Sequence, residues 1–142
     1  MVKGIKNIAP PLKVGIAGLG VVGAGVVRLL DQQADILAAR AGRPIKVVAV
    51  SARDRRKKRD MPKGNWRWFE KAADLAKDPE VDVVVELIGG ADGPARALVE
   101  AALSAGKGVV TANKAMLAMH GAKIAALAEA NNAPLAFEAA VA

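Results

Sequence analysis

The chain has 142 residues, no cysteine, 53% hydrophobic residues and 25% charged residues. This composition is typical of one globular domain, and it excludes a disordered protein, a disulfide framework and a cysteine-ligated zinc site. The net charge is +7, but residues 53–67 alone hold eight Lys or Arg and two Asp, a local balance of +6 that leaves +1 for the rest. A broadly basic surface for nucleic acid or membrane is therefore not expected.

The amino-terminal residues show neither a signal peptide nor a membrane anchor. Residues 1–11 lack the apolar core of a signal peptide, and no stretch approaches about 18 uncharged apolar residues. We therefore expect an N-terminal extension over residues 1–11, one domain over residues 12–142, and a soluble cytoplasmic protein without membrane contact.

Short apolar runs alternate with helical stretches along the chain. Strands are predicted over residues 12–18, 45–50, 81–88, 108–112 and 133–140, and residues 66–69 are left open as a further short strand. Helices are predicted from Val21 onward, over residues 70–76 and 95–105, and from after residue 112 to about residue 130. Strands that are apolar on both faces and separated by helices predict an α/β fold, a doubly wound parallel sheet of the Rossmann type.

A glycine motif follows the first predicted strand. Gly18, Gly20 and Gly23 form a G-x-G-x-x-G pattern, with Val21 and Val22 between the last two glycines. The pattern alone is a weak signal, but here it joins a strand to a helix, where glycines allow a tight turn and close approach of a pyrophosphate. The free N–H groups and the dipole of the helix start would bind the phosphates.

The end of the second predicted strand bears on the choice of cofactor. An NAD-selective site usually has Asp or Glu there, whereas this chain has Ser51, Ala52 and Arg53. A guanidinium can pair with a 2′-phosphate through two hydrogen bonds, so Arg53, supported by Arg55 or Lys57, favours NADP, with NAD as the alternative.

Two further segments end strands on the edge of the sheet where ligands bind. Gly89 and Gly90 would let a nicotinamide ring approach the backbone, and Thr111, Asn113 and Lys114 follow the next strand. A lysine at this point can polarise a carbonyl oxygen or transfer a proton, which is what reduction of an aldehyde requires. The competing interpretation is a solvated residue at a helix start.

These motifs together resemble a known family. Gly18–Gly23, "SARD", "VVVELIGG", "VTANKAMLA" and the closing "FEAAVA" resemble the amino-terminal half of homoserine dehydrogenase, from about residue 12 to the last residue. The resemblance implies an oxidoreductase of amino-acid biosynthesis that reduces L-aspartate 4-semialdehyde to L-homoserine with NADPH or NADH, on the route to threonine and methionine.

The resemblance also implies roles for single residues. Lys114 would bind substrate and nicotinamide and take part in catalysis, and Thr111 and Asn113 would flank the nicotinamide. Glu138, with the carbonyl of Val141, would form part of a site for a monovalent cation such as Na⁺. The expected partner is the small-molecule substrate, with a second copy of the chain left open.

In the resembled family, "FEAAVA" leads into a substrate and dimerisation domain that supplies further catalytic and cation-binding residues. The sequence ends at Ala142, so we expect a cofactor domain, as a fragment or truncated relative, with negligible turnover by itself.

Two alternatives of other classes stay open. One is a nucleotide-binding regulatory module without chemistry, and the other is a nucleic-acid binder that uses residues 53–68, with Trp66 and Trp68 stacking on bases. We expect these two tryptophans to anchor the loop to the core instead. His120 is expected to be a surface or packing residue, and Glu86 to be buried and hydrogen-bonded.

Overall fold

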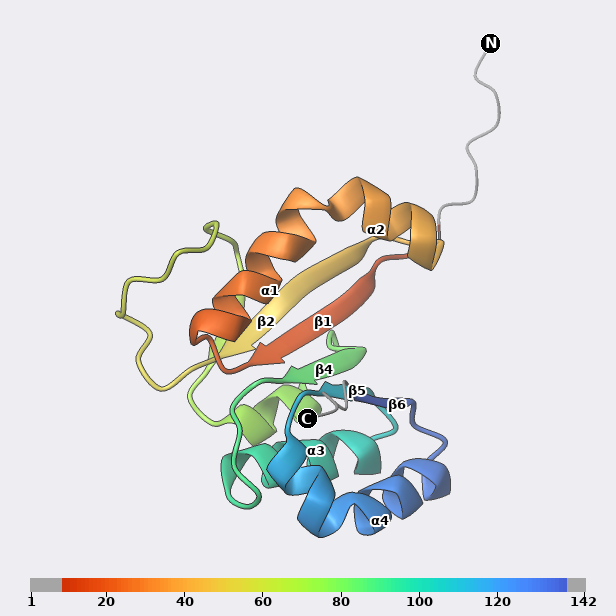
Figure 1. The fold of residues 1–142 in the computed structure, drawn as a ribbon. Helices are drawn as coiled ribbons and strands as arrows, with labels where there is room; N and C mark the ends of the chain where they lie inside the picture. The colour runs from red at the N-terminus through yellow and green to blue at the C-terminus, as the bar shows by residue number, and fades with distance from the viewer. Residues whose placement is uncertain (1–8, 138–142) are drawn as a thin grey trace.

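The computed structural model describes residues 9–137 as a six-stranded parallel sheet with helices on both faces (Figure 1). The spatial order of the strands is β3-β2-β1-β4-β5-β6, and each neighbouring pair is parallel. The strands are β1 (Leu12–Ala17), β2 (Ile45–Ser51), β3 (Arg67–Phe69), β4 (Val83–Glu86), β5 (Gly108–Thr111) and β6 (Leu135–Phe137). The predicted doubly wound α/β sheet is confirmed, and residues 66–69 do contribute the additional strand.

The helices are divided between the two faces of the sheet. Helices α1 (Val21–Gln32) and α2 (Ala34–Ala41) cover β1 and β2, whereas the other face carries the 3₁₀ helix η1 (Ala72–Lys77), α3 (Pro94–Ser104) and α4 (Lys114–Ala130) (Figure 1). In the sheet, β1 and β4 are neighbours, and the strand order reverses between them: the connecting helices lie on one face on the β1 side and on the other face on the β4 side. Such a switch point opens a crevice at the carboxyl ends of the strands, where ligands of this fold class bind.

Some element boundaries differ from those predicted. The helix predicted from Val21 onward breaks into two at Gln33, which has φ −105° and ψ 18°. The strand predicted over residues 81–88 is shorter, because the chain turns away after Glu86 toward two positive-φ glycines, Gly89 and Gly90. The short helix predicted over residues 70–76 is a 3₁₀ helix over Ala72–Lys77. The last strand is described only to Phe137, so its predicted end at residue 140 lies outside the described residues.

Two apolar cores lie on opposite faces of the sheet. Ile16 packs with Val27 of α1 and Val50 of β2, whereas Leu98 and Leu103 of α3 pack on the other face. All five side chains are at most 3% exposed. Burial of each such side chain stabilises the fold by about 1.5–3 kcal/mol, so the two cores fix the sheet that carries the crevice.

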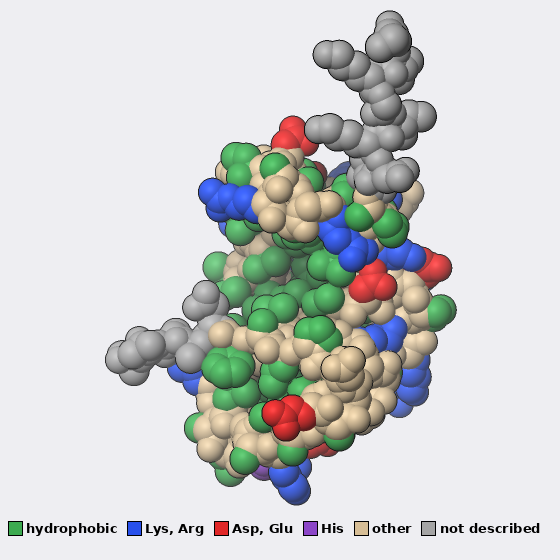
Figure 2. Space-filling view, turned by 90° about the vertical axis from the view of Figure 1, so that its right-hand side faces the viewer, with side chains coloured by type: hydrophobic (Ala, Val, Ile, Leu, Met, Phe, Trp, Pro, Cys, Tyr) green, Lys and Arg blue, Asp and Glu red, His purple; other side chains and the backbone are tan. Residues whose placement is uncertain are grey.

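The half of the sheet formed by β4, β5 and β6 carries helices on one face only, within the described residues (Figure 1). Val109 belongs to the core beneath α3 and α4, so its neighbour Val110 points to the opposite face, where it is 38% exposed. Figure 2 shows hydrophobic side chains in a hollow between the α1–α2 layer and the lower half of the molecule. Apolar surface of this kind is typical of contact surfaces.

An ion pair between the buried Asp78 and the exposed Arg67, near the opposite end of the sheet, makes stability depend on pH. Asp78 is buried and accepts hydrogen bonds from the Glu80 N–H (2.9 Å) and from Arg67 Nε (2.8 Å). Burial acts to raise the pKa of Asp78, but these two hydrogen bonds and the charges of Arg67 and Lys107 outweigh it, so the net pKa is lowered.

A lowered pKa in the folded state means that the Asp78 carboxylate stabilises the fold above its ordinary pKa of about 3.9. That stability is lost as the pH falls through the lower, folded-state value. We expect Asp78→Asn to cost about 1.5–3 kcal/mol near pH 7, and the difference from wild type to shrink as the pH approaches 3. Urea unfolding of both proteins between pH 7 and pH 3 measures this; a difference that is constant over this range would contradict the expectation.

Candidate cofactor-binding site

The glycine loop joins β1 to α1 and is held by backbone contacts. Gly18 has φ +96°, and its N–H donates to the Ser51 carbonyl (2.9 Å). A Cβ on Gly18 would lie 2.7 Å from the Leu87 backbone, and a Cβ on Gly23 would lie 1.9 Å from the Gly18 carbonyl oxygen. Both glycines are therefore required by the fold itself.

Gly20 differs from the other two glycines of the motif. It is the N-cap of α1, with φ −72° and ψ −159°, and a Cβ there would meet no described protein atom within 4 Å. The fold itself therefore does not require glycine at this position. A ligand that approaches the backbone at Gly20 would require it, and this is the role that the motif assigns to its second glycine.

The start of α1 presents unpaired N–H groups beside this loop. Gly20 makes no side-chain cap hydrogen bond, and the first turn of α1 contains no acidic residue. The first N–H groups of a helix have no partner within it, and the helix dipole is positive there. Val21 and Val22 are 90% and 62% exposed, so this turn is open to a ligand, and its contact with a dinucleotide stays a prediction.

A buried hydrogen-bond network joins the ends of β4 and β5. Glu86 is fully buried, and its Oε1 accepts from the N–H groups of Ile88 (2.7 Å) and Gly89 (3.0 Å). Its Oε2 accepts from the Thr111 hydroxyl (2.6 Å), whose oxygen accepts in turn from the Asn113 N–H (3.1 Å). Glu86 therefore has the structural, hydrogen-bonded role expected of it, and it fixes the turn that leads to the glycine pair.

Asn113 links this network to α4. Its Oδ1 accepts from the Met116 N–H (3.0 Å), which caps the helix, and its Nδ2 donates to the Gly90 carbonyl (2.7 Å). The N-cap residue of α4 thus holds the glycine loop that follows β4. Thr111 and Asn113 are buried in this structural network, whereas the prediction for them was contact with the nicotinamide; that contact stays a prediction.

Lys114 is the first residue of α4 and is exposed. Its ammonium group makes no hydrogen bond or ion pair with the residues that the structure describes. Its backbone is nevertheless fixed, because the helix start is capped by Asn113 and the preceding strand is held through Thr111. The position suits a cation that points from a rigid support toward a ligand.

The basic segment after β2 folds back over the glycine loop. Arg53 is exposed and, among the described residues, has no ion-pair partner. Arg55 lies over the ring of Trp68, 5.4 Å from its centroid. Trp66 and Trp68 are half-buried and pack against the core beneath α1, which confirms that they anchor the loop.

Two residues near the candidate site were missed by the sequence analysis. The first is Arg59, in the basic segment after β2. The sequence analysis singles out only the cations Arg53, Arg55 and Lys57 in the basic segment, yet Arg59 Nε donates to the carbonyl of Leu19, within the glycine motif (3.0 Å). Nothing in the sequence distinguishes Arg59 from Arg56, another arginine of the same segment. The contact depends on the path of the loop.

The other missed residue is Asp92, which follows the glycine pair. Its Oδ1 lies 2.9 Å from His120 Nε2 and accepts from Arg96 Nη1 (3.1 Å). Hydrogen bonds from Arg96 and from His120 lower the pKa of Asp92. Because His120 lies in α4, the carboxylate connects the β4–α3 loop to that helix. His120 is accordingly a packing residue with a partner, which lies 28 positions away in the sequence.

Other candidate sites receive little support from the structure. Within residues 9–137, no three acidic or histidine side chains are grouped as metal ligands. Glu138 and Val141 lie outside the described residues, so the monovalent-cation site stays a prediction. One hollow of about 470 Å³ lies between α4 and β6, and another of about 500 Å³ lies beside α1. Neither hollow is lined by a predicted cofactor residue.

Strand register brings the predicted site residues to one edge. Ala17 pairs with both Ser51 and Glu86, and Glu86 pairs with Thr111, so β1, β2, β4 and β5 end at the same level. The glycine loop, Arg53, the Gly89–Gly90 pair and Lys114 all follow directly from these ends. This fold and this arrangement define a Rossmann-type domain that binds a nicotinamide dinucleotide.

Comparison with known proteins identifies the family within this class. Residues 18–138 match the family model described as "Homoserine dehydrogenase, NAD binding domain". The homoserine dehydrogenase of Pseudomonas aeruginosa is 48% identical over 132 residues, which cover 93% of this chain and 30% of the relative. That of Corynebacterium glutamicum is 47% identical over 135 residues, with 94% of this chain and 30% of the relative covered.

A solved structure agrees with these sequence matches. The homoserine dehydrogenase from Thiobacillus denitrificans superposes with a TM-score of 0.83 at 44% identity, covering 92% of this chain and 30% of that one. The chain belongs to the family of homoserine dehydrogenase NAD-binding domains, which confirms the resemblance. It spans about 30% of the length of the relatives that it matches.

No helix in the described part of the chain is both long and apolar enough to cross a membrane.

Proposed function

We propose that the chain is the cofactor-binding part of a homoserine dehydrogenase, which interconverts L-homoserine and L-aspartate 4-semialdehyde with a nicotinamide dinucleotide. The observation that carries this proposal is the joint position of the glycine loop, the Gly89–Gly90 pair and Lys114 at the carboxyl edge of the sheet. The family match supports the same activity. The substrate-binding part would come from the remainder of a protein of the relatives' length.

The chain's own residues would bind and orient the reactants. The N–H groups at the start of α1 would bind the pyrophosphate, and Gly89 and Gly90, both with positive φ, would let the nicotinamide lie against the backbone. The bound cofactor supplies or accepts the hydride. Lys114 would point at the substrate oxygen, where an ammonium group stabilises negative charge that develops as an aldehyde is reduced.

The preference for NADP is a further part of this proposal. Arg53 follows the end of β2 by two residues and is exposed at the site edge. The described structure offers it no carboxylate partner, so its guanidinium is free to pair with a 2′-phosphate. An acidic residue, which would repel that phosphate and bind a 2′-hydroxyl, is not present at residues 51–53.

Calorimetric titration of the purified chain with NADPH and with NADH tests this proposal on wild type and Arg53→Ala. We expect wild type to bind NADPH more tightly than NADH. The variant should lose about tenfold or more in NADPH affinity, since a charge-assisted pair is lost, and should change little toward NADH. Equal losses for the two nucleotides would assign Arg53 a role other than reading the 2′-phosphate.

The nucleic-acid alternative is not favoured, because the two tryptophans that it would use, Trp66 and Trp68, pack against the core. Arg55 covers the Trp68 ring, and the guanidinium carbon of Arg59 lies 5.7 Å from the centroid of the same ring. The cation site at Glu138 and Val141 and a cytoplasmic location remain predictions of the same proposal.

A further inference from the structure

Residues 53–61, called here the basic loop, fold around one side chain. The three guanidinium nitrogens of Arg59 each donate to a backbone carbonyl. Nη2 reaches Asp54 (2.6 Å), Nη1 reaches Lys57 (3.1 Å) and Nε reaches Leu19 (3.0 Å). Two of these acceptors belong to the basic loop and the third belongs to the glycine loop. A single half-buried arginine therefore joins the two loops.

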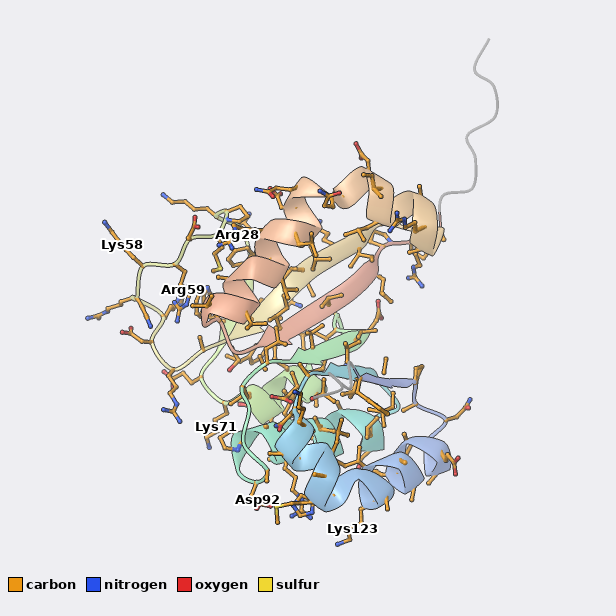
Figure 3. The ribbon with its side chains drawn as sticks, in the orientation of Figure 1. Arg28, Lys58, Arg59, Lys71, Asp92 and Lys123 are labelled. Atoms are coloured by element: carbon orange, nitrogen blue, oxygen red, sulfur yellow. The ribbon has the colours of Figure 1, made fainter. Side chains whose placement is uncertain are left out.

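A second contact attaches the same loop to α1. Arg28 Nη1 donates to the Asp60 side chain (3.1 Å) and to the Asp60 carbonyl. In Figure 3, Arg28 and Arg59 both lie where the loop passes α1. The basic loop is thus fixed on one side by the glycine motif and on the other by the helix that this motif opens.

The neighbouring cations behave differently. Lys58 points away from the body of the molecule (Figure 3) and is exposed, as are Arg56 and Lys57. Their side chains donate no hydrogen bond to any described residue. Charge alone therefore does not explain how Arg59 acts, since three adjacent residues carry the same charge without these contacts.

Lysine could not replace Arg59 in this arrangement. The guanidinium is planar and presents its donors in a fixed fork, so it can reach three carbonyls that lie in different directions. An ammonium group is a compact point charge on a flexible stem. It would keep the charge near Trp68 but could not hold Asp54, Lys57 and Leu19 at the same time.

We infer that Arg59 is a positioning residue for cofactor selection: it locks the basic loop to the glycine loop, so that Arg53 and the pyrophosphate-binding turn form one rigid unit. The inference rests on the proposed function, because it concerns how the 2′-phosphate is read. Arg59 acts through the carbonyls that it binds rather than by touching the cofactor. Displacement of a binding group by about 1 Å is enough to weaken recognition strongly.

The test compares Arg59→Lys with the matched control Lys58→Ala, using the whole chain. In the absence of nucleotide, hydrogen–deuterium exchange of residues 53–61 should become faster in Arg59→Lys and stay at the wild-type rate in Lys58→Ala. In calorimetric titrations, Arg59→Lys should lose about tenfold in NADPH affinity, whereas its NADH affinity should change less than about threefold. Arg28→Gln, which reaches the loop only through Asp60, should shift both readouts in the same direction.

The possible failures are distinguishable. Equal losses of NADPH and NADH affinity in Arg59→Lys, unchanged exchange in the basic loop, or an effect of Lys58→Ala as large as that of Arg59→Lys would each overturn the inference. Wild type that binds neither nucleotide would instead refute the proposed function, and the inference with it, whatever the exchange data show.

Discussion

Gly23→Ala should unfold more readily than wild type, whereas Gly20→Ala should keep wild-type stability and lose affinity for the cofactor. A Cβ on Gly23 would lie 1.9 Å from the Gly18 carbonyl oxygen, and this oxygen belongs to the backbone, which cannot give way like a flexible side chain. The glycine loop must therefore move, and we expect a cost of about 1–3 kcal/mol in the free energy of unfolding. Thermal and urea unfolding without nucleotide measure this cost.

Gly20 provides the complementary result. Its backbone conformation is open to any residue, and a Cβ there meets no described protein atom within 4 Å. We expect Gly20→Ala to change stability by less than about 0.5 kcal/mol. NADPH affinity should nevertheless fall at least about tenfold, because the added methyl group lies where a pyrophosphate approaches. Full affinity in Gly20→Ala would show that the loop is only a turn between strand and helix.

Glu86→Leu should be among the most destabilising single substitutions in the chain. The carboxylate is fully buried and accepts hydrogen bonds from two backbone N–H groups and from the Thr111 hydroxyl. Leucine would leave these three donors without a partner, at about 1–3 kcal/mol for each donor that stays buried. We expect a total loss of about 3 kcal/mol or more, measured by urea unfolding.

Glu86→Gln is the matched control for this prediction. The glutamine carbonyl can still accept from Ile88 and Gly89, and its amide can donate to the Thr111 oxygen in place of the lost acceptor. Its cost should therefore be about 1 kcal/mol. Equal stability of Glu86→Leu and wild type would mean that the network does not support the turn before Gly89.

The sheet could be predicted from the sequence because its strands carry a strong local signal. Ile16, Val50 and Val84 lie in short apolar runs bounded by turn residues, and parallel strands buried on both faces need no alternating pattern. The interruptions and the type of the helices carry a weaker signal in the sequence. No proline or glycine marks the break at Gln33 or the 3₁₀ geometry of η1, so local propensity does not encode them.

The site was predictable where it depends on backbone geometry and not where it depends on long-range contacts. Gly23 is required by a close approach to Gly18 within the motif itself, and Gly18 by its positive φ at the tight turn, so the motif encodes both directly. The Arg59–Leu19 contact joins residues 40 positions apart, and the Asp92–His120 contact joins residues 28 apart. Such pairs become visible only when the register of the sheet and the path of each loop are known.

The central claim is that a nicotinamide dinucleotide binds along the carboxyl ends of β1, β2, β4 and β5. Nuclear magnetic resonance titration of the isotope-labelled chain with NADPH tests it most directly, because each backbone amide reports its own surroundings. We predict saturable shifts in the amides of the glycine loop (18–23), the end of β2 (51–53), the Gly89–Gly90 pair and residues 111–114. Shifts confined to the opposite edge of the sheet, or none up to millimolar NADPH, would contradict the account.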